Sequence, residues 1–574
     1  MAQILFDQIR DFTGGINFRA DQFQLKPNES PSILNMEVDP RGGVFTRAGY
    51  IKKHTNEVTG NWKPKGLFNY NDGTTPLIML TTGYDGAGPT DGRLYKSTGG
   101  NFSTIDSASS TPLNVKSPNG AGLTTWEETL YIALGKNATN MYKWTSGATY
   151  ATSLIASGPT WQQYTLPVGG YMPRAEITVA HANKLFVANT YENGTAYPNR
   201  VRWSHENRPE DWFVDDYIDI IAGGDGVRGL QVVDGQLLIF KPKAVYLLMG
   251  YDADSFQLVE LSTIVGIDYP QQATAGDGGV YFFDYPKGLF FYDRNGIQYI
   301  FDRLSPIIIN NQINSEYLDA VTLSFVNDRL WMSAPFDIGD TGVLPTYATV
   351  NFVFDRTIGP TGAFTMFQSA SEYGLVSGCD WEDATDTAYH LMINPDPNFP
   401  YIFSVDEYSS DNTPVQDKDA VLEGATPSTG DFATQYTTAW FYDERYVQDK
   451  TFVRGLYVVR GVTEPTQIQV NVYHDFNNDS LITNHIINLV PVVEGGLYGT
   501  VSPPAAEYST DGSGGLYGES ILKKGISVGG RLKSAKAVQL EFNGITTVLD
   551  APGRIWGINS IAYKYKRRKV RSNR

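Results

Sequence analysis

The chain has 574 residues, with 45 Lys and Arg against 62 Asp and Glu and a net charge of −17. This excess of negative charge repels phosphate at long range and excludes a general DNA- or RNA-binding protein. A single cysteine excludes a disulfide scaffold, and an apolar content of 41% excludes global disorder. The composition therefore predicts a folded chain with room for more than one core.

The first part of the chain, residues 1–60, is expected to be an extended arm that also closes the domain after it. The N-terminus lacks the basic and long apolar regions of a secretory signal. No apolar run reaches the length of about 18 residues that a membrane-spanning helix needs. We therefore expect neither a signal peptide nor membrane insertion.

Short apolar runs separated by turn residues follow the arm. Runs rich in Val, Ile, Tyr and Phe between such turns predict buried strands. Arg294-Asn295-Gly296 has the composition of a hairpin turn, in which a positive φ is needed. The pattern predicts an all-β protein with one or two short helices, and Ser305–Asp319 is the most ambiguous stretch. Typical strand-like runs are Leu77–Leu80, Leu130–Ala133 and Leu237–Phe240.

These runs repeat about every 50 residues. A second strand-like run follows each of them, often with an aromatic residue at its centre. Four strands per unit at this period are typical of a β-propeller, here of about seven blades over residues 61–410. A tandem of β-sandwiches with coincidental spacing is the alternative. The first runs are centred on Ile78, Tyr131, Phe186, Leu238, Tyr281, Trp331 and Leu391.

The composition changes near residue 410. Residues 411–434 are rich in Ser, Asp, Thr, Pro and Gly, which predicts a linker. Residues 435–565 contain runs that alternate at period two, such as Ile468–Tyr473 and Ala537–Phe542. This alternation is typical of strands with one buried face. The predicted fold is therefore all-β, a β-propeller followed by a β-sandwich or jelly-roll domain.

No motif for catalysis or cofactor binding stands out. Phosphate-loop, nucleophile-elbow and HExxH patterns are missing from the sequence, and its six histidines are scattered. Propellers also host glycosidases, but no pair of carboxylates is singled out. We therefore expect no enzymatic activity, no catalytic residue, no metal and no cofactor.

The most site-like run is Asp475–Asp479, whose oxygen donors at alternate positions could hold Ca²⁺. An EF-hand loop needs Gly and Glu where Ser480 and Ile486 stand. A hairpin turn rich in Asp and Asn is the alternative, and it is favoured.

The C-terminal end has the opposite charge to the rest of the chain. Lys564–Arg574 carries seven positive charges and no negative one, and residues 566–574 are expected to form a basic tail. The tail is either solvated or docks onto an acidic neighbouring surface, such as that of another copy. The candidate interaction residues are Lys564, Lys566, Arg567, Arg568, Lys569 and Arg571.

Several motifs resemble a family of tailed-bacteriophage tail proteins in which a similar opening precedes a β-propeller. The family includes the tail nozzle or hub proteins of short-tailed phages and the minor tail proteins of longer-tailed ones. Weaker matches extend over most of the chain. The motifs of the opening are Asp11–Asn17, Leu25–Ser30, Asn35–Asp39 and Arg41–Tyr50, and the closing one is Ile555–Ile561.

The resemblance implies a structural component of the virion tail, made in the host cytoplasm. Such a protein forms an oligomeric ring, here a homohexamer, that extends the DNA-ejection channel and docks adaptor and fibre proteins. The genomic DNA would pass without specific binding, which suits an acidic wall. The alternative function is a glycan-binding or glycan-degrading tail propeller that acts on the host surface.

Overall fold

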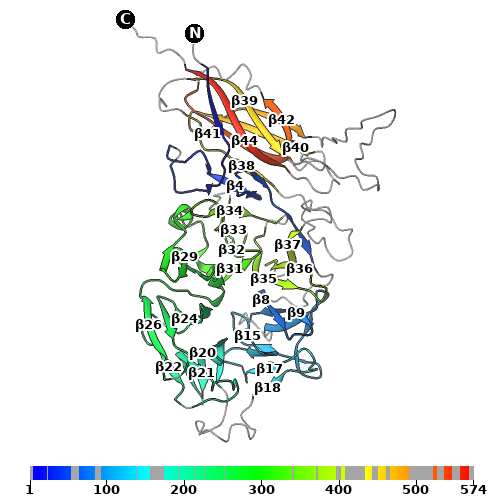
Figure 1. Cartoon of the computed structure of the whole chain (residues 1–574), viewed down its shortest axis with the longest axis vertical. Coiled ribbons are helices and arrows are strands. Elements are labelled where there is room, and N and C mark those ends of the chain that lie inside the picture. The colour runs from blue at the N-terminus through cyan, green and yellow to red at the C-terminus, as the bar shows by residue number, and fades with distance from the viewer. Residues whose placement is uncertain are drawn as a thin grey trace, which may run out of the picture.

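The computed structural model has β-strands as its dominant regular structure. In Figure 1 it is an elongated molecule, with one group of sheets at one end and a second group, close to both termini, at the other. The structure describes residues 4–21, 23–53, 64–83, 92–138, 140–154, 173–192, 194–213, 215–224, 226–252, 254–338, 342–369, 373–395, 402–407, 433–442, 450–460, 466–489, 521–526, 535–545 and 556–567.

Over these residues, seven successive antiparallel units of four strands form the blades of a β-propeller (Figure 1). The predicted all-β class and seven blades are confirmed. The strands are β8 (Pro64–Asn71), β9 (Pro76–Thr82), β10 (Gly92–Ser97) and β11 (Ser103–Thr104) in blade one; β15 (Gly122–Trp126), β16 (Thr129–Ala133), β17 (Tyr142–Trp144) and β18 (Thr152–Ser153) in blade two; β19 (Arg174–His181), β20 (Lys184–Glu192), β21 (Thr195–Trp203) and β22 (Tyr217–Asp219) in blade three; β23 (Gly229–Val233), β24 (Gln236–Lys241), β25 (Ala244–Met249) and β26 (Gln257–Ser262) in blade four; β27 (Ala273–Gly276), β28 (Gly279–Asp284), β29 (Gly288–Asp293) and β30 (Gly296–Tyr299) in blade five; β31 (Thr322–Val326), β32 (Arg329–Ala334), β33 (Val350–Asp355) and β34 (Ala363–Phe367) in blade six; and β35 (Val376–Glu382), β36 (Ala388–Ile393), β37 (Ile402–Glu407) and β7 (Gly49–Lys52) in blade seven.

The blades form a closed ring. From blade two onward, the first strand of each blade lies beside the first strand of the next, and β35 lies beside β8. Blades one and two share a hydrophobic core, and the Tyr70 hydroxyl donates to the Glu128 carbonyl at 2.6 Å. The outermost strand of blade seven is β7, which comes from the N-terminal arm. This ring is the arrangement of a propeller and not of a tandem of sandwiches.

The hairpin between the first two strands of each blade lies on the same face of the ring, because every blade orders its strands alike. In blades four and five this hairpin is an Asp-Gly turn, Asp234-Gly235 and Asp277-Gly278, with positive φ at both positions. Two successive positive φ values define the type I′ turn, whose twist matches the strands it joins. The repeated turn therefore keeps the register of the hairpins constant.

The ambiguous stretch Ser305–Asp319 contains short helices, as the sequence allowed. Pro306 occupies the first position of α1, where its fixed φ and missing N–H cost nothing. The helices are η2 (Pro270–Gln272), η3 (Asp302–Leu304), α1 (Pro306–Ile309) and η4 (Ser315–Ala320), and the remaining short strands of the propeller are β12 (Asp106–Ala108), β13 (Thr111–Pro112) and β14 (Asn114–Val115).

The second group of sheets is a β-sandwich, as predicted. Ile468, Val470 and Val472 alternate with polar residues along one strand and are fully buried against the other sheet. The first sheet contains β42 (Ile521–Ile526), β39 (Lys450–Arg460), β44 (Gly557–Arg567), β6 (Val44–Thr46), β5 (Met36–Val38) and β1 (Ile4–Ile9), and the second contains β38 (Gln435–Thr437), β43 (Val538–Ile545), β40 (Thr466–His474) and β41 (Asn477–Leu489).

The sandwich is therefore not confined to residues 435–565, because the arm adds β1, β5 and β6 to it. The arm also forms the parallel pair β2 (Gly15–Ile16) and β3 (Glu29–Ser30). Of the predicted linker, residues 411–432 lie outside the described part of the chain.

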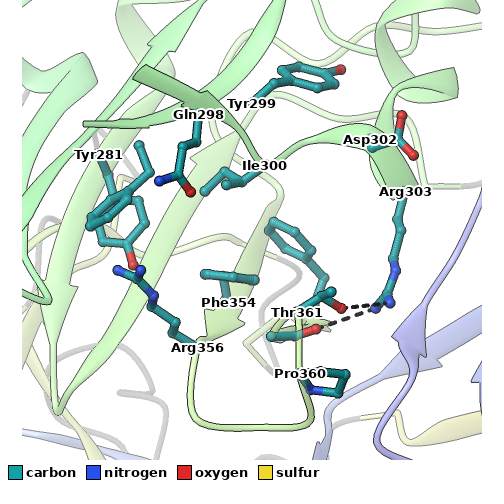
Figure 2. A pocket seen from close by; sticks show the side chains of 13 residues that line it. Tyr281, Gln298, Tyr299, Ile300, Asp302, Arg303, Phe354, Arg356, Pro360 and Thr361 are labelled. Atoms are coloured by element: carbon teal, nitrogen blue, oxygen red, sulfur yellow. Dashed lines mark hydrogen bonds between the residues drawn. The ribbon is translucent and has the colours of Figure 1, made fainter. Parts of the chain in front are cut away.

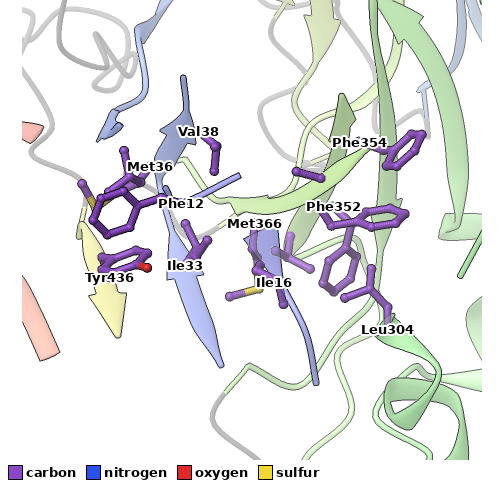
Figure 3. Packing of buried hydrophobic residues seen from close by; sticks show 14 of the residues in the cluster. Phe12, Ile16, Ile33, Met36, Val38, Leu304, Phe352, Phe354, Met366 and Tyr436 are labelled. Atoms are coloured by element: carbon purple, nitrogen blue, oxygen red, sulfur yellow. The ribbon is translucent and has the colours of Figure 1, made fainter. Parts of the chain in front are cut away.

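Strand β4 (Ser32–Leu34) joins the propeller to the sandwich. Its Leu34 pairs with Met366 of blade six on one edge, and its Ile33 pairs with Tyr436 of β38 on the other. Blade six and half of the sandwich thus form one continuous sheet of nine strands. A single hydrophobic cluster follows this sheet from the blade through the arm into the sandwich (Figure 3).

Two buried polar residues complete the joint. The Asn35 backbone N–H donates to the Met366 carbonyl at 2.8 Å. The Asn35 side-chain amide donates to the Ala433 carbonyl at 2.7 Å. Arg47, 1% exposed, donates to the Asn35 side-chain oxygen at 2.9 Å and to the Gln368 carbonyl at 2.8 Å. One short strand and two side chains thus hold three parts of the chain together.

We expect Arg47→Met to destabilise the joint by about 3 kcal/mol, because it leaves buried acceptors without their charged donor. Denaturant unfolding followed by tryptophan fluorescence measures the change. Arg41→Ala is the matched control, since that arginine lies on the same arm but is exposed and paired with Asp39. The control should leave the unfolding curve almost unchanged, and equal effects of both variants would contradict the proposed joint.

Candidate functional site

Two adjoining pockets lie on blades four to six, and Arg356 lines both. Figure 2 shows the first of them. The first has a volume of about 580 Å³ and the second about 450 Å³. Both volumes fall in the range of small-molecule sites. The first is lined by Tyr281, Phe291, Gln298, Tyr299, Ile300, Asp302, Arg303, Phe354, Arg356, Pro360, Thr361, Gly362 and Phe364, and the second by Asp234, Asp277, Gly278, Asp293, Arg294, Asn295 and Arg356.

Aromatic rings from both blades form the wall of the first pocket. Tyr281 and Phe291 of blade five have ring centroids 4.5 Å apart, and Phe354 and Phe364 of blade six are 4.6 Å apart. These four rings are buried, and Tyr299, which is 43% exposed, pairs with Phe290 on the opposite face of blade five. The wall is therefore a fixed apolar surface.

Two glycines leave room for these rings. A Cβ atom on Gly279 would lie 2.4 Å from the Phe291 ring, and one on Gly362 would lie 2.4 Å from the Phe354 ring. Gly362 also has φ +72°, a conformation that disfavours side chains. The shape of the wall thus depends on residues that have no side chain.

A polar chain runs from the aromatic wall to the second pocket. The Tyr281 hydroxyl donates to the Asp277 carboxylate at 2.5 Å, and the Arg356 guanidinium lies 4.4 Å from the centre of the Phe291 ring. Burial raises the pKa of Tyr281 far above its usual value, the hydrogen bond to Asp277 and the Asp277 charge add to the rise, and the Arg356 charge opposes it. The tyrosine therefore stays protonated and works as a hydrogen-bond donor.

Hairpin turns supply the rim of the second pocket. Arg294 donates to the Asp234 carboxylate at 2.8 Å, which joins the turns of blades four and five. The Asp293 carboxylate accepts from the Asn295 backbone N–H at 2.8 Å and so fixes its own turn. Planar carboxylate, amide and guanidinium groups thus converge on one opening.

The arm supports the opposite wall of the first pocket. Arg303 donates to the Gly14 carbonyl at 2.6 Å. It also donates to the Thr361 hydroxyl at 3.0 Å (Figure 2). Arg19 of the arm forms an ion pair with Asp302 at the rim. The pocket is therefore fastened to the same arm that joins the two domains.

The predicted interaction residues at the C-terminus fall partly inside strand β44. The register places Lys564 opposite Arg454 of β39, and Arg567 opposite Lys450 of the same strand. Lys566 lies in β44 as well, whereas Arg568, Lys569 and Arg571 lie outside the described residues. Their role in docking remains a prediction.

The run Asp475–Asp479 contains a hairpin turn, the alternative that the sequence favoured. Asp475 and Phe476 form the two-residue turn between β40 and β41, and both have positive φ. Within the described ranges, no three His, Cys, Asp or Glu side chains come together in a group that could hold a metal ion. In the same ranges, no helix has the length and apolarity to cross a membrane.

Sequence reasoning did not identify the pocket residues. The sequence predicts a hairpin turn at Arg294-Asn295-Gly296. It does not predict that this turn lies beside the turns that contain Asp234 and Asp277. Each lining aromatic residue has the pattern of an ordinary core residue in a strand. The available signal was the density of aromatic residues around the Asp-Gly turn of blade five.

No protein-family model matches the chain, and no curated protein matches its sequence. Solved structures do resemble it. The Dos1 propeller matches with a TM-score of 0.35 and 9% identity, over 63% of this chain and 95% of that one. An exo-β-1,3-galactanase from Phanerochaete chrysosporium matches with a TM-score of 0.22 and 10% identity, over 80% and 98% of the chains.

A third match is a glycoside hydrolase family 43 arabinoxylan arabinofuranohydrolase from Bacillus subtilis, with a TM-score of 0.21, 10% identity and coverage of 91% and 97%. The expectation that this chain is not an enzyme is corrected here, because enzymes stand among the proteins that it resembles. Identities this low concern the fold, so the matches assign neither an activity nor a catalytic residue.

We expect Gly362→Ala to destabilise the protein by about 3 kcal/mol, because backbone strain at positive φ adds to the clash with Phe354. Gly73→Ala is the matched control, since Gly73 has φ +82° but open space around it. In the control, the free energy of unfolding should fall only by the backbone strain, about 1 kcal/mol. Chemical denaturation measures both, and equal losses would show that the glycine does not shape the aromatic wall.

Proposed function

We propose that the chain is a structural component of a bacteriophage virion tail, a nozzle or hub that assembles as a ring. In this role it extends the DNA-ejection channel and docks adaptor and fibre proteins, and the genome passes without specific binding. The protein would be made in the host cytoplasm and function in the virion. The observation that carries the proposal is that the residues of the phage-like opening build the joint between propeller and sandwich.

The Gly-Gly pair of the opening has a physical reason at this joint. A Cβ atom on Gly14 would lie 2.5 Å from the Asn28 carbonyl oxygen, and one on Gly15 would lie 2.8 Å from that of Phe364. Ile16, which follows, is fully buried in the shared core. The motif therefore specifies close backbone packing within the arm, at Gly14, and between the arm and blade six, at Gly15, a property of architecture that proteins with this joint would share.

The charge distribution supports assembly from several copies. Acidic residues occupy most of the hairpins on one propeller face, whereas β44 at the far end of the molecule contains Lys564 and Lys566. A contact between unlike surfaces of two copies is heterologous and closes into a ring when its rotation allows. The exposed acidic residues of these hairpins are Glu127, Glu128, Asp234, Asp277, Asp328 and Asp386.

The alternative is a glycan-binding or glycan-degrading tail propeller that acts on the host surface. The pocket of blades five and six favours binding of a small polar ligand, and this candidate can be tested separately from assembly. Electron microscopy and light scattering of the purified chain test the ring. A strict monomer that never joins tail particles would overturn the structural proposal.

Assembly should depend on the basic residues of β44. We expect the double variant Lys564→Glu, Lys566→Glu to raise the protein concentration needed for ring formation by at least about tenfold, since it reverses two charges at the contact. Wild-type assembly should also weaken as salt is added. Sedimentation velocity over a concentration series measures both effects.

Lys243→Glu is the control, because Lys243 is an exposed lysine on a propeller turn. It should assemble like the wild type. If the double variant forms rings as well as the wild type, β44 is not part of the contact between copies. A ring built through other surfaces would still be possible.

A further inference from the structure

We propose that the two adjoining pockets of blades four to six bind a neutral oligosaccharide. This inference goes beyond the structural role proposed above and does not depend on it. It rests on the shape of the site, on the chemistry of its lining and on the balance of its charges.

The shape fits an extended ligand. The two pockets meet at Arg356 and have volumes of about 580 and 450 Å³. The first is walled by aromatic rings, whereas the second is bordered by polar hairpin turns. A ligand that spans both must present apolar faces and polar edges along its length, which is the character of a chain of sugar rings.

An aromatic wall and an amide lie on the same face of blade five. Gln298 of β30 pairs with Phe291 of β29, and Phe291 pairs with Tyr281 of β28, so these three side chains share the face that lines the first pocket. An aromatic surface binds the C–H groups of a pyranose by burying apolar surface, and an amide beside it can both donate to and accept from hydroxyl groups. Tyr299 pairs with Phe290 on the other face of the blade.

Arg356 provides directional hydrogen bonds at the meeting point of the pockets. Its guanidinium lies 4.4 Å from the centre of the Phe291 ring and beside the Tyr281 hydroxyl (Figure 2), and these neighbours orient the planar group. In the part of the chain that the structure describes, no carboxylate forms an ion pair with it. A guanidinium has five N–H donors, so several remain to bind neighbouring hydroxyl groups.

The charges of the site favour a neutral ligand over a phosphate or another anion. Its lining contains four carboxylates against three guanidinium groups, and Asp277 and Asp293 face the second pocket beside Arg356. An anion would meet repulsion from these carboxylates, whereas hydroxyl groups can donate to them. The same balance disfavours a nucleic acid backbone.

Saturation-transfer NMR and calorimetry on the full chain test the proposal, with short neutral gluco-, galacto-, manno- and xylo-oligosaccharides as probes and inorganic phosphate as the anionic comparison. At least one saccharide should bind, and phosphate should not. Arg356→Ala should weaken binding about tenfold or more, because it removes charge-assisted hydrogen bonds. Gln298→Ala should weaken it about tenfold through the loss of the amide hydrogen bonds.

Two controls match these variants. Arg208→Ala removes a half-exposed arginine on blade three, and Gln257→Ala removes an exposed glutamine at the start of β26 on blade four. Neither should change the affinity. If no saccharide binds, if phosphate binds more tightly, or if the controls weaken binding as much as the pocket variants, the proposal is overturned. If all four variants still assemble into rings, a failure of saccharide binding leaves the proposed structural role untouched.

Discussion

The architecture depends on strand β4, which is hydrogen-bonded on one edge to blade six and on the other to the sandwich. A strand this short supplies few ladder bonds, so side chains complete the connection. Asn35 directs its backbone N–H toward the propeller and its amide toward Ala433, and Arg47 fixes the amide from the other side. A buried donor or acceptor that loses its partner lowers the free energy of unfolding. Loss of any one of these bonds would therefore weaken the whole connection.

This connection makes the two domains one mechanical unit. A hinge between domains needs a linker and a small interface, but here a continuous sheet and a shared hydrophobic core cross the boundary. The pocket belongs to the same unit, because Arg303 in its wall bonds to the Gly14 carbonyl of the arm. Ligand binding on blade five and contacts made by the sandwich would therefore act on one rigid body.

The propeller and the core strands of the sandwich could be predicted because their signals are local. Every blade repeats the same apolar runs and tight turns, and strands such as β40 alternate along their own length. The arm strands could not be predicted, since β5 and β6 have three residues each and show no period. Their partners are remote in sequence: the Ser30 hydroxyl, for example, donates to the Thr437 carbonyl. The pocket was missed for the same reason, because its wall combines rings from Tyr281 to Phe364 that each fit a buried strand.

The sequence motif that resembles phage tail proteins and the pocket carry different kinds of information. Gly14, Gly15 and Ile16 are explained by close packing and burial at the joint, and none of them offers a group that would bind a ligand or take part in a reaction. A likeness in this motif therefore bears on how the domains are joined and on the class of assembly in which such a joint is used. The residues proposed to bind a ligand are Arg356, Gln298 and the aspartates of the hairpin turns, which the motif does not include. Because the two sets of residues are separate, the structural role and the binding role can be retained or rejected independently of each other.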